Sequence, residues 1–295
     1  MNDSSSHVQA RKILWWLVMA LSLVAAGCVF LWWRGPARRM PAPGWQHVPT
    51  TQPPHDLIPR RACFTYHDRA AVPPRIVEAI AAACNDIPFH IFDDAEALQY
   101  LVAHFGASFA NQFLAFPTGA HKADLFRYAW LYREGGVYFD IKTKFTQGVD
   151  KMFPWRTQRA MCTVLSAIPG TIYQGVLASY AHNPHLEEAL RHVEDTSVED
   201  VDRHYLLFTQ QLHDILAIAA TTGALVPGWN TLRDGPVTKT PVGTTTALLL
   251  YVEQCHASCV HRDRYGLCCS VVDRDGAHVC DVRHADFPWR PRPAA

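Results

Sequence analysis

The 295-residue sequence has no excess of charge of either sign, because Lys and Arg number 27 and Asp and Glu also number 27. Nucleic-acid-binding proteins usually carry a basic excess, so this balance argues against that class. The chain also lacks the apolar-poor composition of a disordered protein, since 49% of its residues are hydrophobic. No internal repeat is visible. The length allows one large domain or two ordinary ones.

Charge is absent from one long stretch near the amino terminus. Residues 13–33 form a run of 21 uncharged residues, which as a helix at about 1.5 Å per residue spans roughly the 30 Å of a bilayer core. A cleaved signal peptide has a shorter apolar core before its cleavage site, whereas this run continues past Ala25-Ala26-Gly27. Tryptophans stand at both ends, where headgroups would lie: Trp15, Trp16, Trp32 and Trp33. We therefore predict a transmembrane helix over residues 13–33.

The segments around this helix predict a tail, a stem and one folded domain. Residues 1–12 form the tail, and residues 34–56 hold six prolines without a hydrophobic period, which is typical of an extended stem. The domain is expected over 57–295. Basic residues flank the apolar run on both sides, so the positive-inside rule does not fix its orientation: Arg11 and Lys12 before it, Arg34, Arg38 and Arg39 after it.

The first part of the domain alternates strand-like and helix-like segments. Residues 62–66 and 89–92 have strand character, residues 74–84 are helical in pattern, and a further helix capped by Asp94 ends at Gly106. Such alternation predicts the α/β class with a mostly parallel sheet and helices on its faces.

Residues 120–143 contain the main candidates for a ligand-binding or catalytic site. A helix ends at Gly135-Gly136 and a strand follows. Asp124 and Arg127, three residues apart, share a helix face, and Tyr138, Asp140 and Lys142 alternate onto one strand face. Charges of both signs at the end of a strand suit a polyanionic, hydroxyl-rich ligand. The alternative is a helix ion pair beside an edge-strand charge pair.

This segment resembles the DXD-motif glycosyltransferases of family 32, which include the yeast initiating mannosyltransferase, inositol-phosphoceramide mannosyltransferases and capsular polysaccharide enzymes. Their pattern is approximately A-x-K-[SA]-D-x-x-R-Y-x-x-L-Y-x-x-G-G-[IV]-Y-x-D, and residues 120–140 match it at every fixed position. Weaker similarity extends over residues 57–240, at Ile58-Pro59-Arg60, Phe92-Asp93-Asp94, Ile172-Tyr173-Gln174-Gly175 and Asp234-Gly235-Pro236.

The resemblance implies a GT-A nucleotide-sugar-binding fold and retaining transfer of a hexose from a nucleoside diphosphate sugar. Asp124 and Arg127 would hold the donor sugar hydroxyls and the phosphate side. Asp140 would contact the ribose or sugar and the metal-bound diphosphate, and Tyr138 would join these three in donor binding.

Lys142 departs from the family pattern, because a second Asp that ligates a divalent cation, Mn²⁺ or Mg²⁺, is usual there. Two outcomes are open. Lys142 itself neutralises the leaving diphosphate as a compact cation, or Asp140 holds the metal together with diphosphate oxygens and a carboxy-terminal ligand. For that ligand His284 is a candidate, and Asp286 is its rival.

Eight cysteines follow Cys28, and five of them cluster between residues 255 and 280. Disulfides or buried thiols are one interpretation, and zinc bound by Cys255, His256, Cys259 and His261 with later cysteines is the other. Residues 267–272 and 277–282 predict a hairpin. A four-residue loop would place Cys269 opposite Cys280, whereas a two-residue loop would place Val271 there.

These observations predict a single-pass, type II membrane glycosyltransferase of the Golgi or another secretory membrane. It would act on a glycan or glycolipid acceptor and bind no nucleic acid. The alternative is a membrane-anchored sugar-binding protein derived from such an enzyme, with catalysis lost at Lys142. Retention of Asp124, Arg127 and Asp140 together argues against this alternative.

Overall fold

The computed structural model describes residues 57–155, 159–229, 246–256, 268–273 and 275–282. The predicted tail, transmembrane helix and stem lie outside these ranges, as do His284 and Asp286. Among the described helices, none combines the length and the apolar character needed to cross a membrane.

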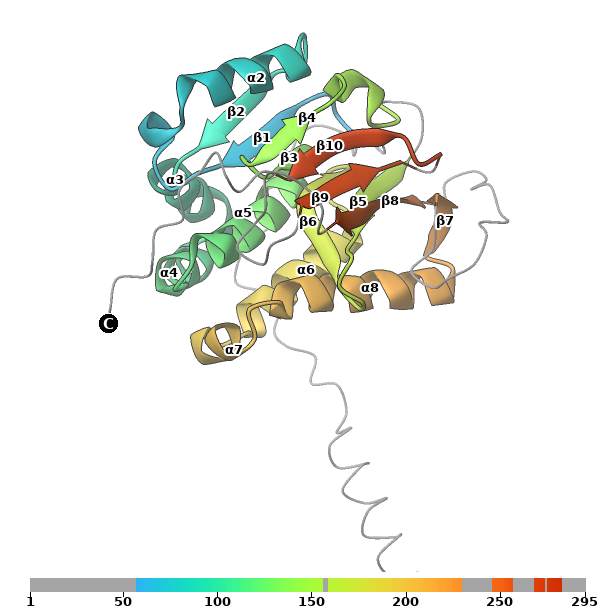
Figure 1. The fold of residues 1–295 in the computed structure, drawn as a ribbon. Helices are drawn as coiled ribbons and strands as arrows, with labels where there is room; N and C mark the ends of the chain where they lie inside the picture. Colours follow the sequence, from blue (N-terminus) through green and yellow to red (C-terminus); the bar gives the residue numbers. More distant parts are fainter. Residues whose placement is uncertain (1–56, 156–158, 230–245, 257–267, 274, 283–295) are drawn as a thin grey trace, which may run out of the picture. The chain divides into compact units, whose positions relative to one another are not determined.

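A ten-stranded mixed sheet forms the centre of the domain (Figure 1). Its strand order is β2-β1-β3-β6-β5-β8-β9-β10-β4, and β7 pairs with β8 off this path. The strands are β1 (Ala62–Thr65), β2 (Phe89–Phe92), β3 (Gly136–Phe139), β4 (Thr143–Phe145), β5 (Ala160–Leu165), β6 (Ile172–Ser179), β7 (Leu225–Trp229), β8 (Thr246–His256), β9 (Cys268–Val272) and β10 (His278–Val282).

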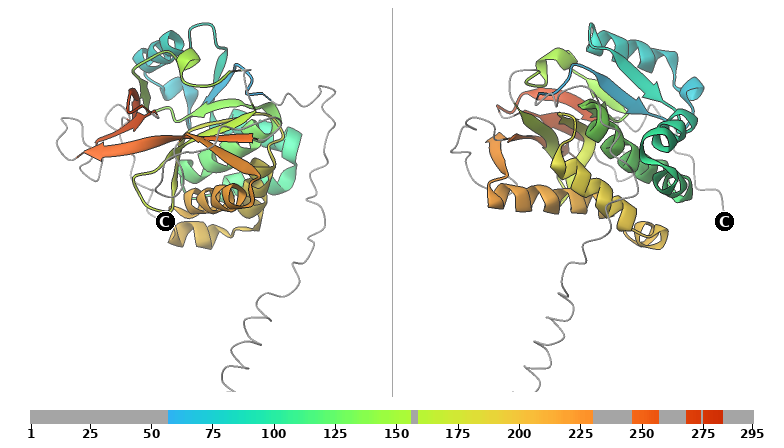
Figure 2. Two further views of the ribbon diagram at one scale, coloured as in Figure 1. Left: turned by 90° about the vertical axis from the view of Figure 1, so that its right-hand side faces the viewer. Right: turned by 180° about the vertical axis from the view of Figure 1, so that it is seen from behind.

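Helices cover both faces of the sheet, with α2 on one face and α3, α4, α5, α6 and α8 on the other (Figures 1 and 2). The helical elements are η1 (Arg69–Ala71), α2 (Pro74–Cys84), α3 (Asp94–Phe105), α4 (Ala107–Ala115), α5 (Gly119–Glu134), η2 (Val149–Lys151), α6 (Pro184–Asp195), α7 (Val198–Arg203) and α8 (Leu207–Thr222).

Successive side chains of the buried strands point to opposite faces of the sheet and belong to two separate hydrophobic cores. In β3, Tyr138 belongs to the core under α5, whereas Val137 and Phe139 belong to the core under α2. In β8, Leu248 and Leu249 divide in the same way. This period of two, with apolar residues on both sides, is typical of strands covered on both faces.

The α/β class is confirmed, but the expectation of a mostly parallel sheet is wrong. The predicted alternation holds through β1, α2, β2 and α3, where β1 pairs in parallel with both β2 and β3. Beyond β3 the chain forms antiparallel pairs, such as β5 with β6 and β9 with β10. These strands follow one another through short turns, which permit only antiparallel pairing, rather than through crossover helices.

The start of α3 differs from the prediction by one residue. Asp93, not Asp94, is the N-cap: its carboxylate accepts the Glu96 N–H at 2.9 Å, and the Glu96 side chain accepts the Asp93 N–H at 3.3 Å. This reciprocal capping box satisfies two backbone donors that the first helical turn leaves without partners.

The carboxy-terminal hairpin is present, with the register that the two-residue loop predicts for Cys280. Cys280 pairs with Val271, so the four-residue alternative, with Cys269 opposite Cys280, is wrong. An irregularity between His278 and Cys280 absorbs the change in register near the turn. Cys269 instead forms a disulfide with Cys255, so Cys255 is not available as a zinc ligand while this bond is intact.

Two consecutive glycines join α5 to β3. Gly135 caps the helix with φ 64° and donates its N–H to Leu131 at 2.9 Å, and Gly136 has φ 109°. A Cβ on Gly136 would lie 2.6 Å from Arg61 Cγ and 2.7 Å from the Arg61 carbonyl oxygen. Side chains are therefore excluded here both by conformation and by space.

Replacing Gly136 by alanine is expected to lower the free energy of unfolding by about 2–5 kcal/mol, because a strained φ and a clash with backbone act together. The matched control is Gly223→Ala, where φ is 80° but no atom lies within 4 Å of the new Cβ. The control should cost only about 1–2 kcal/mol. Urea denaturation measures both, and equal losses would show that space at Gly136 is unimportant.

Candidate functional site

Helix α5 carries two charged residues into the interior. As whole residues, Asp124 and Arg127 are 7% and 4% exposed, among neighbours such as Leu125 and Tyr128 that are also buried. Charged side chains are rarely buried to this extent unless they are paired. The local sequence thus places an ion pair within the otherwise mostly apolar buried part of α5.

Arg127 lies between two carboxylates. Its Nη2 atom is 3.3 Å from Asp124 Oδ1 and 3.3 Å from Asp140 Oδ1. Its Nη1 donates to the Gln174 carbonyl oxygen at 2.6 Å, and its Nε donates to the Ala123 carbonyl oxygen at 3.1 Å. Every nitrogen of the guanidinium is therefore engaged, which fixes its plane.

The aromatic ring of Tyr138 packs against the same guanidinium. The Arg127 Cζ atom lies 4.4 Å from the centre of the Tyr138 ring, a cation–π contact. The Tyr138 hydroxyl donates to Asp140 Oδ1 at 3.0 Å, and Thr65 Oγ1 is 2.9 Å from the same hydroxyl. Asp140 is thus oriented by two neighbours before any ligand arrives.

Asp140 occupies the carboxyl end of β3, where its N–H donates to the Gly175 carbonyl oxygen at 2.9 Å. Thr65 marks the carboxyl end of β1, which is parallel to β3. Ligands of open α/β sheets bind beyond this edge. The Asp140 side chain is 28% exposed, against 10% for Asp124 and 5% for Arg127, so it is the member most accessible to a ligand.

Burial governs the protonation of the site. It raises the pKa of the Asp124 carboxyl above its usual value, although the charge of Arg127 acts in the opposite direction. Burial also raises the pKa of the Tyr138 phenol well above its usual range. Tyr138 therefore keeps its proton and remains a donor to Asp140 at neutral pH.

Residues 73–159 match the family described as "Glycosyltransferase sugar-binding region containing DXD motif". This range contains Asp124, Arg127, Tyr138 and Asp140. The chain is a glycosyltransferase. Among solved structures it is similar to the PaToxG glycosyltransferase, with 15% identity, a TM-score of 0.37, and coverage of 56% of this chain and 70% of that chain. No curated protein matches the chain.

Four residues of the predicted site in this glycosyltransferase come together as expected: Asp124, Arg127, Tyr138 and Asp140. Lys142 does not continue their strand alternation, because β3 ends at Phe139 and residues 141–142 form a turn. Lys142 is half-buried and lines a hollow of about 430 Å³ beside α2, together with Thr143 and Lys144.

One carboxylate does not make a metal site by itself, and Asp140 Oδ1 already accepts hydrogen bonds from Arg127 and Tyr138. Within the described ranges, Asp140 belongs to no group of three His, Cys, Asp or Glu residues whose ligand atoms converge. The described residues of the glycosyltransferase thus do not form a metal site there by themselves. The predicted second ligand, His284, lies outside them.

Gln174 is a site residue that the sequence pattern showed only as part of a buried strand. It is 3% exposed, and neither its amide oxygen nor its amide nitrogen makes a well-formed hydrogen bond within the described residues. The Tyr128 phenol interacts with the Gln174 side chain but donates its hydrogen to the Phe208 carbonyl oxygen at 3.3 Å. A buried amide left in this state can gain a hydrogen bond from a ligand hydroxyl. The sequence signal that could have identified Gln174 is a polar side chain within a strand whose other residues are mostly apolar.

Asp124→Asn removes one carboxylate partner of Arg127, and its stability relative to the wild type is expected to shift in favour of the variant as the pH rises. The native pKa of Asp124 is raised, so ionisation of Asp124 opposes folding once the pH exceeds its unfolded value near 3.8. This shift in the difference between variant and wild type should grow as the pH rises from that value through the native pKa, and then stay constant. Denaturation midpoints at pH 4 and pH 8 measure it.

The control is Asp94→Asn, which removes a partly exposed ion pair with Lys122 at 2.9 Å. It should lower stability by less than about 1 kcal/mol at both pH values. A loss of stability for Asp124→Asn that is larger at pH 8 than at pH 4 would contradict the stated effect of burial.

Proposed function

We propose that this glycosyltransferase moves a hexose from a nucleoside diphosphate sugar, GDP-mannose or a UDP-sugar, to a hydroxyl of a glycan or glycolipid, with retention of configuration, on a GT-A fold. The observation that carries the proposal is the guanidinium of Arg127 held between Asp124 and Asp140 at the carboxyl edge of β3.

The arrangement suits a donor with hydroxyls on one side and phosphates on the other. Carboxylates accept hydrogen bonds from sugar hydroxyls, and a guanidinium donates to hydroxyl or phosphate oxygens. Arg127 is fixed by the Gln174 carbonyl oxygen and the Tyr138 ring, so it does not have to be ordered when the donor binds. Gln174 offers an amide for a further sugar hydroxyl.

Retaining transfer needs no separate base from the chain. The acceptor oxygen forms a bond to the anomeric carbon while the bond from that carbon to the diphosphate oxygen breaks. The acceptor proton passes to the departing phosphate oxygen, which becomes more basic as it leaves. The chain's task is to position both substrates and to stabilise the charge of the diphosphate.

Lys142 is our candidate for that stabilisation. It follows Asp140 by two residues, within the turn that leads to β4, and its compact positive charge would neutralise a diphosphate bound beyond Asp140. DXD-motif glycosyltransferases typically use a divalent cation for this purpose, so metal dependence is the property that distinguishes the two modes.

We further propose that residues 13–33 anchor the enzyme as a type II protein in a Golgi or other secretory membrane. The support comes from the sequence: an uncharged run of bilayer length with tryptophans at both ends, followed by a proline-rich stem. Such an anchor would present the domain to glycan or glycolipid acceptors.

Asp140→Asn is expected to lower donor turnover by at least about 100-fold, because it removes charge that orients Arg127 and the donor. Release of UDP or GDP from a panel of nucleotide sugars, measured on the full-length chain, gives the rate. Asp94→Asn is the matched control and should retain activity. If the wild type binds a donor but releases no nucleotide, the non-catalytic sugar-binding alternative is supported instead.

Lys142→Met is expected to lower turnover by about 10–100-fold, whereas EDTA should leave wild-type turnover largely intact. Lys144→Met, which replaces an exposed lysine in β4, serves as the control and should have little effect. Complete loss of wild-type activity in EDTA, with recovery on addition of Mn²⁺, would show that a metal performs the role assigned to Lys142.

A further inference from the structure

The disulfide between Cys255 and Cys269 joins β8 to β9, away from the Arg127 site in the strand order of the sheet. The two residues are direct partners in the antiparallel ladder, with Cα atoms 4.1 Å apart. Both are partly exposed. A small reductant and a dissolved ion can therefore reach the sulfur atoms.

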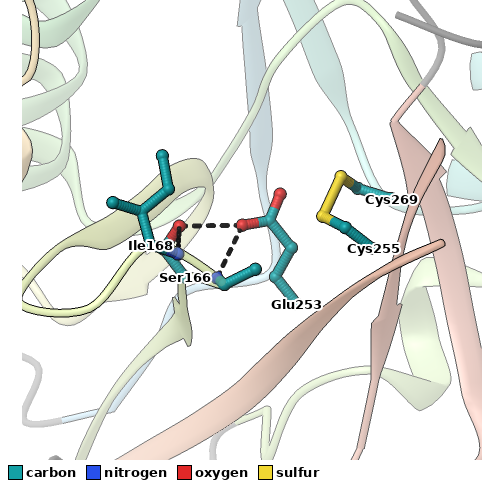
Figure 3. Close-up of a disulfide and its surroundings, with 6 residues drawn as sticks. Ser166, Ile168, Glu253, Cys255 and Cys269 are labelled. Carbon is teal, nitrogen blue, oxygen red and sulfur yellow. Dashed lines mark hydrogen bonds between the residues drawn. A yellow bond between two sulfur atoms is a disulfide. The ribbon is translucent and has the colours of Figure 1, made fainter. Parts of the chain in front are cut away.

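A carboxylate accompanies the two sulfurs. Glu253 precedes Cys255 by two residues in β8, so both side chains stand on the same face of the sheet. Ligand atoms of Glu253, Cys255 and Cys269 all lie within 4.8 Å of one another. Figure 3 shows the Glu253 carboxylate beside the disulfide.

The position of Glu253 is fixed from the opposite side. Its Oε2 atom accepts the Ser166 hydroxyl at 2.8 Å and the Ala167 N–H at 3.0 Å, in the turn between β5 and β6 (Figure 3). No further hydrogen bond engages the other carboxylate oxygen within the described residues. Supporting hydrogen bonds of this kind orient a carboxylate for metal ligation.

The ladder would keep the two sulfurs together after reduction. Pairs on both sides of the cysteines, Gln254 with Ser270 and His256 with Cys268, hold β8 and β9 in register. On its other edge β8 pairs in parallel with β5, so the strand is supported from both sides. The thiols would therefore remain neighbours without the covalent bond.

The remaining cysteines described with their side chains do not share these properties. Cys63, Cys84, Cys162 and Cys280 are free and buried. Burial raises the pKa of the Cys84 thiol to about 11 and that of Cys280 to about 12. Thiols of that kind bind metals and react with oxidants poorly, because the thiolate is the active form.

We propose that Cys255, Cys269 and Glu253 form a redox-gated site for a thiophilic divalent cation of the zinc class. With the disulfide intact, the sulfurs are not available as thiolate ligands. Two molecules of a small thiol reduce the disulfide, giving two cysteine thiols and one oxidised thiol dimer. The cation then binds both sulfurs with release of two protons, and the Glu253 carboxylate supplies the third ligand.

The ligand chemistry fits zinc better than calcium or magnesium. Two thiolates and one carboxylate carry three negative charges in a small volume, which a cation must offset. Thiolate sulfur selects zinc-class ions, whereas calcium and magnesium prefer all-oxygen sites. Zinc is usually four-coordinate with sulfurs at about 2.3 Å, so water would complete the shell.

Cobalt titration tests the site, because Co²⁺ replaces Zn²⁺ and thiolate ligation gives a charge-transfer band in the near ultraviolet. The full-length chain in mild detergent is titrated after oxidation with a diazene dicarboxamide and after reduction with a phosphine. Peptide mapping with an alkylating agent confirms the state of Cys255 and Cys269. The reduced chain should show the band, saturating at one equivalent and reversed by Zn²⁺, and the oxidised chain should not.

Two variants identify the ligands. Glu253→Gln should weaken Co²⁺ binding by about 10–100-fold, whereas Gln254→Ala, at the exposed neighbouring position on the opposite face of β8, should leave it unchanged. Circular dichroism checks that both variants are folded. The proposal is wrong if the oxidised chain binds Co²⁺ equally well, if the reduced chain gives no more thiolate band than Cys255→Ser/Cys269→Ser, or if Glu253→Gln binds like the wild type.

Discussion

The position of Arg127 is the constraint on which the donor edge of this glycosyltransferase depends. A buried guanidinium is tolerated only when its charge and its N–H groups are matched, and here two carboxylates, two carbonyl oxygens and an aromatic ring provide the match. These partners come from α5, β3, β6 and the residue after β3. One side chain therefore ties together the elements that meet at the carboxyl edge of the sheet.

That arrangement has a cost that is visible in Asp124. Burial raises the pKa of its carboxyl despite the adjacent arginine, so the protein interior disfavours the charged form of Asp124. Sites that bind ligands often keep such groups, because the environment that disfavours the charge strengthens its interaction with a bound donor. The unsatisfied amide of Gln174 is a second instance within the same cluster. Both features make sense if the site reaches its most stable state with a sugar bound.

Local rules predicted the first half of the domain well. Helix α2 and strand β2 have the bounds that the sequence indicated, and α5 ends at the glycine expected to cap it. The ion pair of Asp124 and Arg127 follows from a spacing of three on a helix. The position of Lys142 did not follow, because alternation holds only while the strand continues and β3 ends at Phe139. Antiparallel pairing beyond β3 and the partner of Cys269 depend on register between distant segments, which no local pattern contains.

The strand that follows Asp140 has its partner near the other end of the described chain. Strand β4 pairs with β10, and the Thr146 hydroxyl donates to the carbonyl oxygen of His278, 132 residues later in the sequence. Closing so long a loop is slow, and such a contact forms only after most of the intervening chain has been made. During synthesis on a ribosome, strand β4, which follows the turn carrying Asp140 and Lys142, would therefore pair only after the carboxy-terminal hairpin has been made. The Arg127 cluster needs only residues up to β6, so it can form earlier in synthesis. The pairing of β4 with β10 can form only later.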